Sequence, residues 1–269
     1  MTLELELGEL AADIAREAGA LARRRRQEGV NLAATKSTLA DIVTDADREV
    51  EALIRARLRA ERPGDGFLGE ETGAEIGETD VTWVVDPIDG TVNYAYGIPA
   101  YNVSIAAVRG GADPETWEAL AGAVFAPALD ELFTAVRGHG AWLGPLRLAV
   151  TTDTAAGALL GTGFGYDPAT HDGDLATVRR VMTMARDLRR MGAAALDLAY
   201  VAAGRLDGYF ERGLSPWDFA AGALLVREAG GKVSRLDVAS SRPMVIAGGA
   251  DVHDRLLSLI GDESAVRKA

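Results

Sequence analysis

The stretch WVVDPIDGTVNY, residues 83–94, sets two aspartates directly after an apolar run. The run 81–85 predicts a buried strand, and the proline after Asp86 ends it, because proline fixes φ and lacks an N–H. Asp86 and Asp89 can then face a common point, with the Ile88 carbonyl between them. Mg²⁺ prefers such carboxylate and carbonyl oxygens, and a substrate phosphate commonly completes its coordination. The stretch is therefore a candidate magnesium site beside a buried strand.

Gly90 and Thr91, directly after the second aspartate, can open a short helix. A helix N-terminus attracts anions, and glycine lets a phosphate approach the backbone closely. The same letters also fit a strand that ends in an Asx turn, followed by an aspartate helix cap. Taken alone, the stretch leaves both interpretations open.

Two further segments place an acid at a strand end or helix start. GFLGEETG, residues 66–73, ends a predicted strand at glycine and continues with Glu70. In SPWDF, Ser215 suits an N-cap, and Asp218 falls in the first helical turn, where the helix dipole favours an acid. Locally, Asp218 is a capping residue first and a metal ligand second.

A second helix is predicted from about Leu39 to before Pro63, with an apolar stripe along one face. Asp47 interrupts this stripe, four residues after Val43 and three before Val50. An unpaired carboxylate on a packed face is costly, so an inward Asp47 requires a partner. The alternative is a surface acid on a helix whose phase differs by one residue.

The composition indicates a globular protein without nucleic-acid or membrane partners. Of the 269 residues, 48% are hydrophobic, enough to fill a sizeable core. Lys and Arg number 28 against 40 Asp and Glu, a formal charge of -12, whereas a nucleic-acid backbone or an anionic membrane requires a basic face. The absence of cysteine excludes disulfides and thiolate chemistry. With no recognisable leader or membrane-spanning run, we expect a cytoplasmic protein.

The order of predicted elements divides the chain near residue 150. Residues 1–150 carry two helices and then closely spaced strands, which is typical of an antiparallel or mixed sheet. Residues 151–269 alternate helices with strands, which indicates a second α/β layer. We expect an N-terminal α+β half with most of the metal ligands and a C-terminal α/β half with Asp218 and the substrate-facing loop, forming one continuous catalytic unit.

In this order, GEET, WVVDPIDGTVNY and SPWDFAAGALLVREAGG resemble the signature blocks of the inositol monophosphatase family of Mg²⁺-dependent, lithium-sensitive phosphatases. DIVTDADREVE (41–51) and LDGYFE (206–211) extend the resemblance over most of the chain. The resemblance implies an α/β (α+β) fold, a layered α-β-α-β-α sandwich of the inositol monophosphatase and fructose-1,6-bisphosphatase type. It also implies a homodimer.

The resemblance further implies a role for each site residue. Asp86 would bridge two Mg²⁺ ions, and a third ion would lie near Glu70. Thr91, paired with Asp47, would orient or deprotonate the attacking water, and Glu70 would share in catalysis. The implied metal ligands are Glu70, Asp86, the Ile88 carbonyl, Asp89 and Asp218. The implied substrate contacts are Asp89, Gly90, Thr91, Gly192, Ala193, Ala194 and Glu211.

Hydrolysis of inositol monophosphate is the expected reaction. Glu211 matches the family position that binds sugar or inositol hydroxyls, and a carboxylate acceptor suits a polyol. Histidinol phosphate, fructose 1,6-bisphosphate and 3'-phosphoadenosine 5'-phosphate are alternative substrates for the same machinery. Outside the enzymes, the alternative is a regulatory or binding protein that retains the fold.

Overall fold

The computed structural model describes residues 1–29, 32–35, 42–111, 113–154, 156–236 and 240–266. Helices make up the outer and central layers of the molecule. They are α1 (Leu3–Glu28), α2 (Asp45–Glu61), α3 (Thr91–Tyr96), α4 (His171–Val181), α5 (Ala194–Ala202), α6 (Pro216–Glu228) and α7 (Ala250–Val266), with a 3₁₀ turn, η1, at Pro168–Thr170. Within the described residues, no helix is both long and apolar enough to cross a bilayer.

The larger sheet is antiparallel except for one pair of neighbours, β3 and β5, which run parallel. In spatial order its strands are β10 (Leu146–Arg147), β9 (Gly140–Leu143), β8 (Glu131–Val136), β7 (Glu118–Ala126), β6 (Asn102–Arg109), β5 (Val81–Asp89), β3 (Gly66–Gly69) and β4 (Gly73–Glu75). Closely spaced strands, interrupted only by the short helix α3, therefore form a mixed sheet, as predicted.

The smaller sheet mixes parallel and antiparallel pairs. In spatial order its strands are β12 (Ala185–Arg189), β11 (Ala158–Thr162), β13 (Gly208–Arg212), β15 (Met244–Gly248) and β14 (Lys232–Leu236). A separate pair, β1 (Leu32–Thr35) and β2 (Ile42–Thr44), precedes α2.

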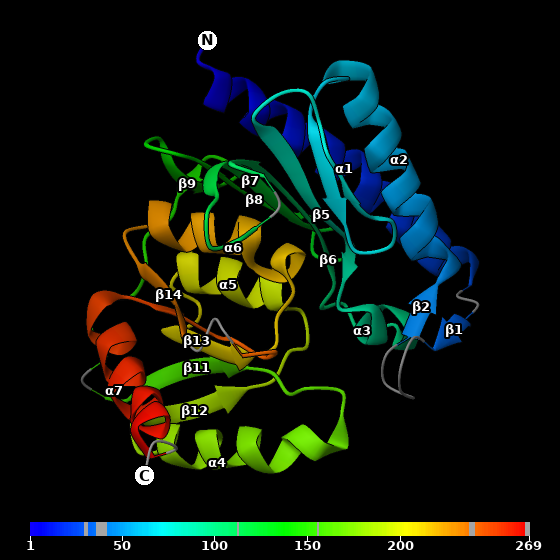
Figure 1. Ribbon diagram of the computed structural model, residues 1–269. Helices are drawn as coiled ribbons and strands as arrows, with labels where there is room; N and C mark the ends of the chain where they lie inside the picture. Colours follow the sequence, from blue (N-terminus) through cyan, green and yellow to red (C-terminus); the bar gives the residue numbers. More distant parts are fainter. Residues whose placement is uncertain (30–31, 36–41, 112, 155, 237–239, 267–269) are drawn as a thin grey trace.

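Figure 1 shows how these elements stack. Helices α1 and α2 cover one face of the larger sheet, and α5 and α6 lie between the two sheets. Helices α4 and α7 cover the outer face of the smaller sheet. The described chain thus has the expected α-β-α-β-α order.

Three apolar clusters fill the four helix–sheet interfaces. The cluster beneath α1 and α2 includes Ile14, Val50 and Trp83, each at most 1% exposed. The central cluster joins α5 and α6 to both sheets, and the third lies beneath α4 and α7. Burial of apolar surface on this scale, at about 25 cal/mol per Å², is the main force holding the layers together.

Several sequence predictions differ from the structure. The predicted helix start, Leu39, lies outside the described residues, and α2 begins at Asp45, because residues 42–44 pair with β1. The strand that Pro87 was expected to end continues to Asp89. The pairing of β5 with β6 has a bulge between Asp86 and Asp89. Proline is tolerated at a bulge, because its missing N–H is not needed for a hydrogen bond between the strands.

Candidate active site

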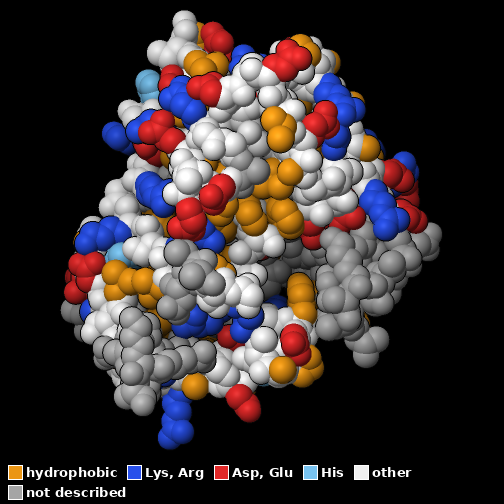
Figure 2. Space-filling model, in the orientation of Figure 1, with side chains coloured by type: hydrophobic (Ala, Val, Ile, Leu, Met, Phe, Trp, Pro, Cys, Tyr) orange, Lys and Arg blue, Asp and Glu red, His pale blue; other side chains and the backbone are white. Residues whose placement is uncertain are grey.

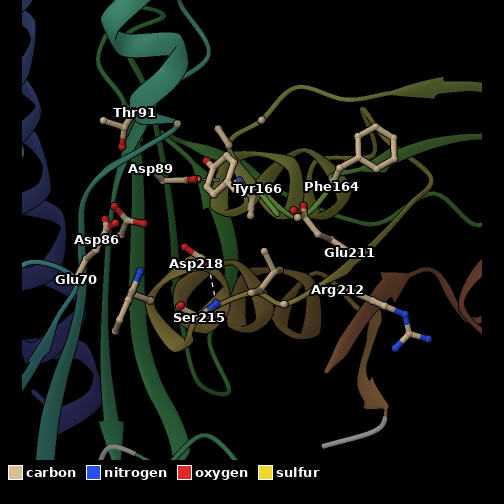
Figure 3. A pocket seen from close by; sticks show the side chains of 18 of the residues that line it. Glu70, Asp86, Asp89, Thr91, Phe164, Tyr166, Glu211, Arg212, Ser215 and Asp218 are labelled. Atoms are coloured by element: carbon tan, nitrogen blue, oxygen red, sulfur yellow. Dashed lines mark hydrogen bonds between the residues drawn. The ribbon is translucent and has the colours of Figure 1, made fainter. Parts of the chain in front are cut away.

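The parallel pair β3 and β5 brings two acidic segments to the same edge of the sheet. Gly69 lies opposite Val85, so Glu70, which follows β3, emerges beside Asp86. The Glu70 amide also donates to the Val85 carbonyl oxygen at 3.3 Å. Figure 3 shows the Glu70 and Asp86 side chains next to one another at one side of a pocket. The two acidic segments therefore lie side by side in the folded chain.

The turn after β5 is shaped by its own side chains. An oxygen of Asp86 accepts a 3.1 Å hydrogen bond from the Ile88 amide. Gly90 has φ +88°, and a Cβ there would lie 2.8 Å from the Ala100 carbonyl oxygen. Only glycine combines this left-handed backbone with so close an approach. Helix α3 then begins at Thr91, as the sequence predicted.

Thr91 links this turn to α2. Its hydroxyl lies 3.1 Å from the Ile88 carbonyl oxygen and 3.4 Å from an oxygen of Asp47. Asp47 is 1% exposed in the first turn of α2. The inward orientation predicted for Asp47 is confirmed, and the surface alternative is wrong. Because α2 starts later than predicted, Val43 is not on the helical stripe used in that argument.

Asp218 points into the same pocket from the start of α6 (Figure 3). Ser215 is the N-cap, Pro216 occupies the first turn, and an oxygen of Asp218 accepts from the Ser215 amide at 2.6 Å. This is the predicted capping box. The cap fixes the position of Asp218 at the pocket wall.

Asp89 connects the larger sheet to helix α5. One of its oxygens accepts from the Ala194 amide at 3.1 Å, and the other from Ala195 at 2.8 Å and from the Asn102 side chain at 2.7 Å. The N-cap residue Ala193 provides no side-chain cap, so Asp89 supplies the acceptor for the first amides of α5. Burial raises the pKa of Asp89, and these hydrogen bonds oppose the rise.

Asn102 is a site residue that the sequence did not reveal. It is fully buried opposite Asp89 on β6, and its side-chain oxygen has no hydrogen-bond partner among the described residues. The only sequence signal for Asn102 is a polar residue beside an apolar run. The pairing of β5 with β6 is what places Asn102 beside Asp89. The sequence did not reveal the role of Asn93 either. Its side-chain amide donates 2.7 Å hydrogen bonds to the carbonyl oxygens of Ala100 and Met191.

These segments enclose a cavity of about 630 Å³. Figure 2 shows that this face of the molecule is hollowed where they meet. The predicted site residues that line the cavity are Glu70, Asp86, Ile88, Asp89, Gly90, Thr91, Gly192, Ala193, Ala194, Glu211 and Asp218. Asp47 is the exception, because it lies behind Thr91. The sequence prediction did not include Arg190 and Tyr166, which also line the cavity.

Glu211 stands opposite Glu70 and Asp86 in the cavity, next to Phe164 (Figure 3). Burial raises the pKa of Glu211 to about 7, against the opposing hydrogen bond from the Tyr209 hydroxyl. The group can therefore change charge near neutral pH.

The acids at the other end of the cavity repel one another. Burial raises the pKa of Asp86 well above its usual range, and the charges of Glu70 and Asp89 raise it further. The pKa of Asp218 is raised well above its usual range for the same reasons, burial first and then Asp89 and Glu70. A divalent cation would offset this repulsion, and carboxylate oxygens are the donors that Mg²⁺ prefers. Among the described residues, however, no three acidic or histidine side chains converge closely enough to hold a metal ion as they stand.

Comparison with known proteins gives the class of protein. The sequence model of the inositol monophosphatase family matches residues 5–262. The chain therefore belongs to this family. It is 44% identical over 256 residues to the inositol-1-monophosphatase of Mesorhizobium japonicum, covering 93% of this chain and 89% of that one.

Two further comparisons extend the match. The chain is 42% identical over 235 residues to the Nus factor SuhB of Haemophilus influenzae, covering 86% of each chain. Its fold matches the crystal structure of the extragenic suppressor protein SuhB of Bartonella henselae with a TM-score of 0.85 at 38% identity, over 93% of this chain and 96% of that one.

Proposed function

We propose that this protein is a Mg²⁺-dependent phosphomonoesterase that hydrolyses inositol monophosphate to inositol and inorganic phosphate. The observation that carries the proposal is the single cavity shared by Glu70, Asp86, Asp89 and Asp218 at one end and Glu211 at the other. Inositol-1-monophosphatase is also the name of the Mesorhizobium japonicum relative.

Two or three Mg²⁺ ions fit the donors at the acidic end. Glu70, Asp86 and the Ile88 carbonyl would hold one ion, and Asp86, Asp89 and Asp218 a second. Bound Mg²⁺ supplies charge neutralisation of the phosphate, a water of lowered pKa and stabilisation of the leaving oxygen. Cations there would favour the ionised form of Asp86, whose pKa is raised by burial and by the neighbouring acids.

Thr91 and Asp47 would handle the proton of the attacking water. The Thr91 hydroxyl lies 3.4 Å from Asp47, so it can donate to this carboxylate while its own lone pairs face the cavity. Glu70 would share this role at the edge of β3. The backbone at Gly90 and Thr91 would face the phosphate, where glycine permits close approach.

The opposite wall would bind the polyol. In its ionised form, Glu211 accepts hydrogen bonds from hydroxyl groups, and Gly192, Ala193 and Ala194 leave space for a ring. A polyol with one phosphate suits this cavity, because its phosphate would lie at the end with the proposed metal ligands and its hydroxyl groups would lie beside Glu211.

Phosphate release with Mg²⁺ should be measured on inositol 1-phosphate, histidinol phosphate, fructose 1,6-bisphosphate and 3'-phosphoadenosine 5'-phosphate. The expected result is preferential release from inositol 1-phosphate and none from Asp89→Asn. Release from histidinol phosphate alone would eliminate the inositol assignment. Loss of activity in millimolar lithium is a separate expectation of the same metal arrangement.

A second candidate is a regulatory or binding protein that retains the fold. The relative named Nus factor SuhB, 42% identical, is the observation in its favour. The formal charge of -12 argues against a nucleic-acid partner. Absence of phosphate release from every substrate tested would favour this candidate.

We also infer that residues 1–150 and 151–269 act as one catalytic unit. A second inference is that the protein is a cytoplasmic homodimer. Its substrate, in the same proposal, is a small phosphomonoester. Hydrogen bonds from the α5 amides to Asp89 support the first inference. Light scattering during size-exclusion chromatography tests the second, and a monomeric mass would contradict it.

A further inference from the structure

Helix α2 carries a second buried acid, one turn beyond Asp47. Glu51 is 1% exposed, like Asp47, and both are among the buried residues of α2. Figure 1 shows that α2 covers one face of the larger sheet. One oxygen of Glu51 accepts a 2.8 Å hydrogen bond from the Glu71 amide. That amide is the one directly after Glu70. The side chain of Glu51 therefore contacts the acidic segment from behind.

The backbone leaves space for this carboxylate. A Cβ at Gly69 would lie 2.5 Å from the Glu51 oxygen that receives the hydrogen bond. This glycine has an ordinary strand φ, so its lack of a side chain, rather than conformational freedom, makes the contact possible. Gly69, the last residue of β3, thus leaves room for the Glu51 carboxylate from α2.

Packing alone does not account for Glu51. Its other oxygen is buried and has no hydrogen-bond partner among the described residues. Burying a carboxylate with so few partners opposes folding, whereas an apolar side chain of similar size would fill the same space without that cost.

Ion pairs with the neighbouring arginines do not account for the buried Glu51 carboxylate either. A groove of about 640 Å³ is lined by Glu51 together with Arg48, Arg55 and other residues of α2 and the Glu71–Thr72 segment. Arg55 donates to Thr72 and Glu75, and Arg48 lies 3.8 Å from Glu71. Within the described part of the chain, Glu51 itself forms no ion pair.

We propose that Glu51 is a positioning residue that holds the Glu70–Glu71 backbone, so that the Glu70 carboxylate stays beside Asp86. The proposal rests on the proposed function, in which Glu70 is a metal ligand. It makes α2 the common support of two groups, because Asp47 contacts Thr91 and Glu51 contacts the Glu71 amide. Loss of such an outer partner typically weakens metal affinity by about 10- to 100-fold.

The test uses Glu51→Ala, which removes the acceptor, and Glu51→Gln, which retains one. Ile54→Val is the control, because it removes a methyl group from a fully buried position on the same helix. The first measurement is hydrogen exchange of residues 69–73 in the metal-free protein. We expect exchange at least about tenfold faster in Glu51→Ala, and close to wild type in Glu51→Gln and Ile54→Val.

The second measurement is Mg²⁺ affinity by calorimetry without substrate. We expect Glu51→Ala to bind at least about tenfold more weakly, Glu51→Gln to recover most of the loss, and Ile54→Val to match wild type. Unchanged exchange in Glu51→Ala, or Mg²⁺ affinity equal to that of Ile54→Val, would overturn the proposal. A wild type that binds no Mg²⁺ would overturn the proposed function instead, and the exchange measurement would still decide whether Glu51 holds the segment.

Discussion

The side-chain amide of Asn93 donates a 2.7 Å hydrogen bond to the carbonyl oxygen of Met191, 98 residues further along the chain. Its second proton goes to the Ala100 carbonyl oxygen at the same distance. Both donors of a nearly buried side chain are therefore used. The bond fixes the start of the Gly192 loop against α3, so the wall proposed to bind the polyol is tied directly to the turn that carries Asp89.

Asn93→Ala should raise KM for inositol 1-phosphate more than it lowers kcat, because the loop moves and the acids stay in place. Leaving two carbonyl groups without a donor should also lower the unfolding free energy by about 1–3 kcal/mol. Steady-state kinetics and urea unfolding measure the two effects. Asn93→Asp, which has nearly the same shape but cannot donate, should be no better. A wild-type KM in both variants would contradict the role given to Asn93.

Asn102→Ala should weaken Mg²⁺ binding by about tenfold, because Asp89 loses one of the donors that hold its carboxylate. Calorimetry without substrate measures the affinity. Ser104→Ala is a suitable control, since Ser104 is equally buried on β6 and its hydroxyl donates to the Trp217 carbonyl rather than to an acid. Equal losses in the two variants would show that β6 packing, and not the bond to Asp89, is responsible.

Thr91→Val should lower kcat by about 10²- to 10⁴-fold, the range expected for loss of a group that handles a proton in the transition state. Valine keeps the shape of threonine and removes the hydroxyl that lies 3.4 Å from Asp47. Thr91→Ser keeps the hydroxyl and should stay within about tenfold of wild type. Rates at saturating substrate and Mg²⁺ provide the measurement. If the valine variant is as active as the serine variant, the hydroxyl has no part in the reaction.

Glu211 should make the unfolding free energy depend on pH between 4.5 and about 7, its ordinary and folded pKa values. Across this interval the folded protein keeps a proton that the unfolded chain releases, so stability falls as pH rises, by up to about 1.4 kcal/mol per pH unit. Burial is the main cause of the raised pKa of Glu211; Asp89 and Asp174 add to it, whereas the Tyr209 hydrogen bond and Arg190 lower it.

The measurement for Glu211 is urea unfolding of wild type and Glu211→Gln at several pH values. The difference between the two proteins should change across the interval and level off above about pH 7. Parallel curves would mean that Glu211 ionises normally in the folded protein.

Mg²⁺ at about 100 times its dissociation constant should raise the unfolding free energy by about 2.7 kcal/mol for each independent site, because it binds only the folded acids. Chelation should reverse the effect. Asp86→Asn should abolish most of it, since Asp86 belongs to both proposed metal sets. Asp187→Asn, an exposed acid on β12, is the matched control and should respond like wild type. Thermal unfolding with and without Mg²⁺ distinguishes these outcomes.

The parts of the fold that the sequence predicted are those with strong local patterns. The apolar run 81–85 specifies both the type and the buried position of β5. The start of α2 was misplaced, because Ile42 and Val43 fit a helical stripe as well as the strand they form.

The site was predicted to the extent that its residues lie in recognisable motifs. Asn93 and Asn102 act through partners that only the folded chain brings near, so their roles cannot be assigned from the sequence alone. Glu51 is an instructive omission. It lies four residues after Asp47, and the spacing argument that turned Asp47 inward applies equally to Glu51.

The parallel β3–β5 pair has a consequence for natural variation in length. Side chains alternate between faces along a strand, so a slip of one residue between Gly69 and Val85 would turn Glu70 away from Asp86. Deletions and insertions in 66–69 should therefore be excluded among functional relatives. The connection 76–80, which follows the short edge strand β4, is also constrained, because the amides of Glu78 and Thr79 donate to the Gly64 carbonyl oxygen and a Cβ at Gly77 would lie 2.2 Å from the Gly66 nitrogen. This connection therefore holds the start of β3, so the number of residues along β3 is fixed at both of its ends.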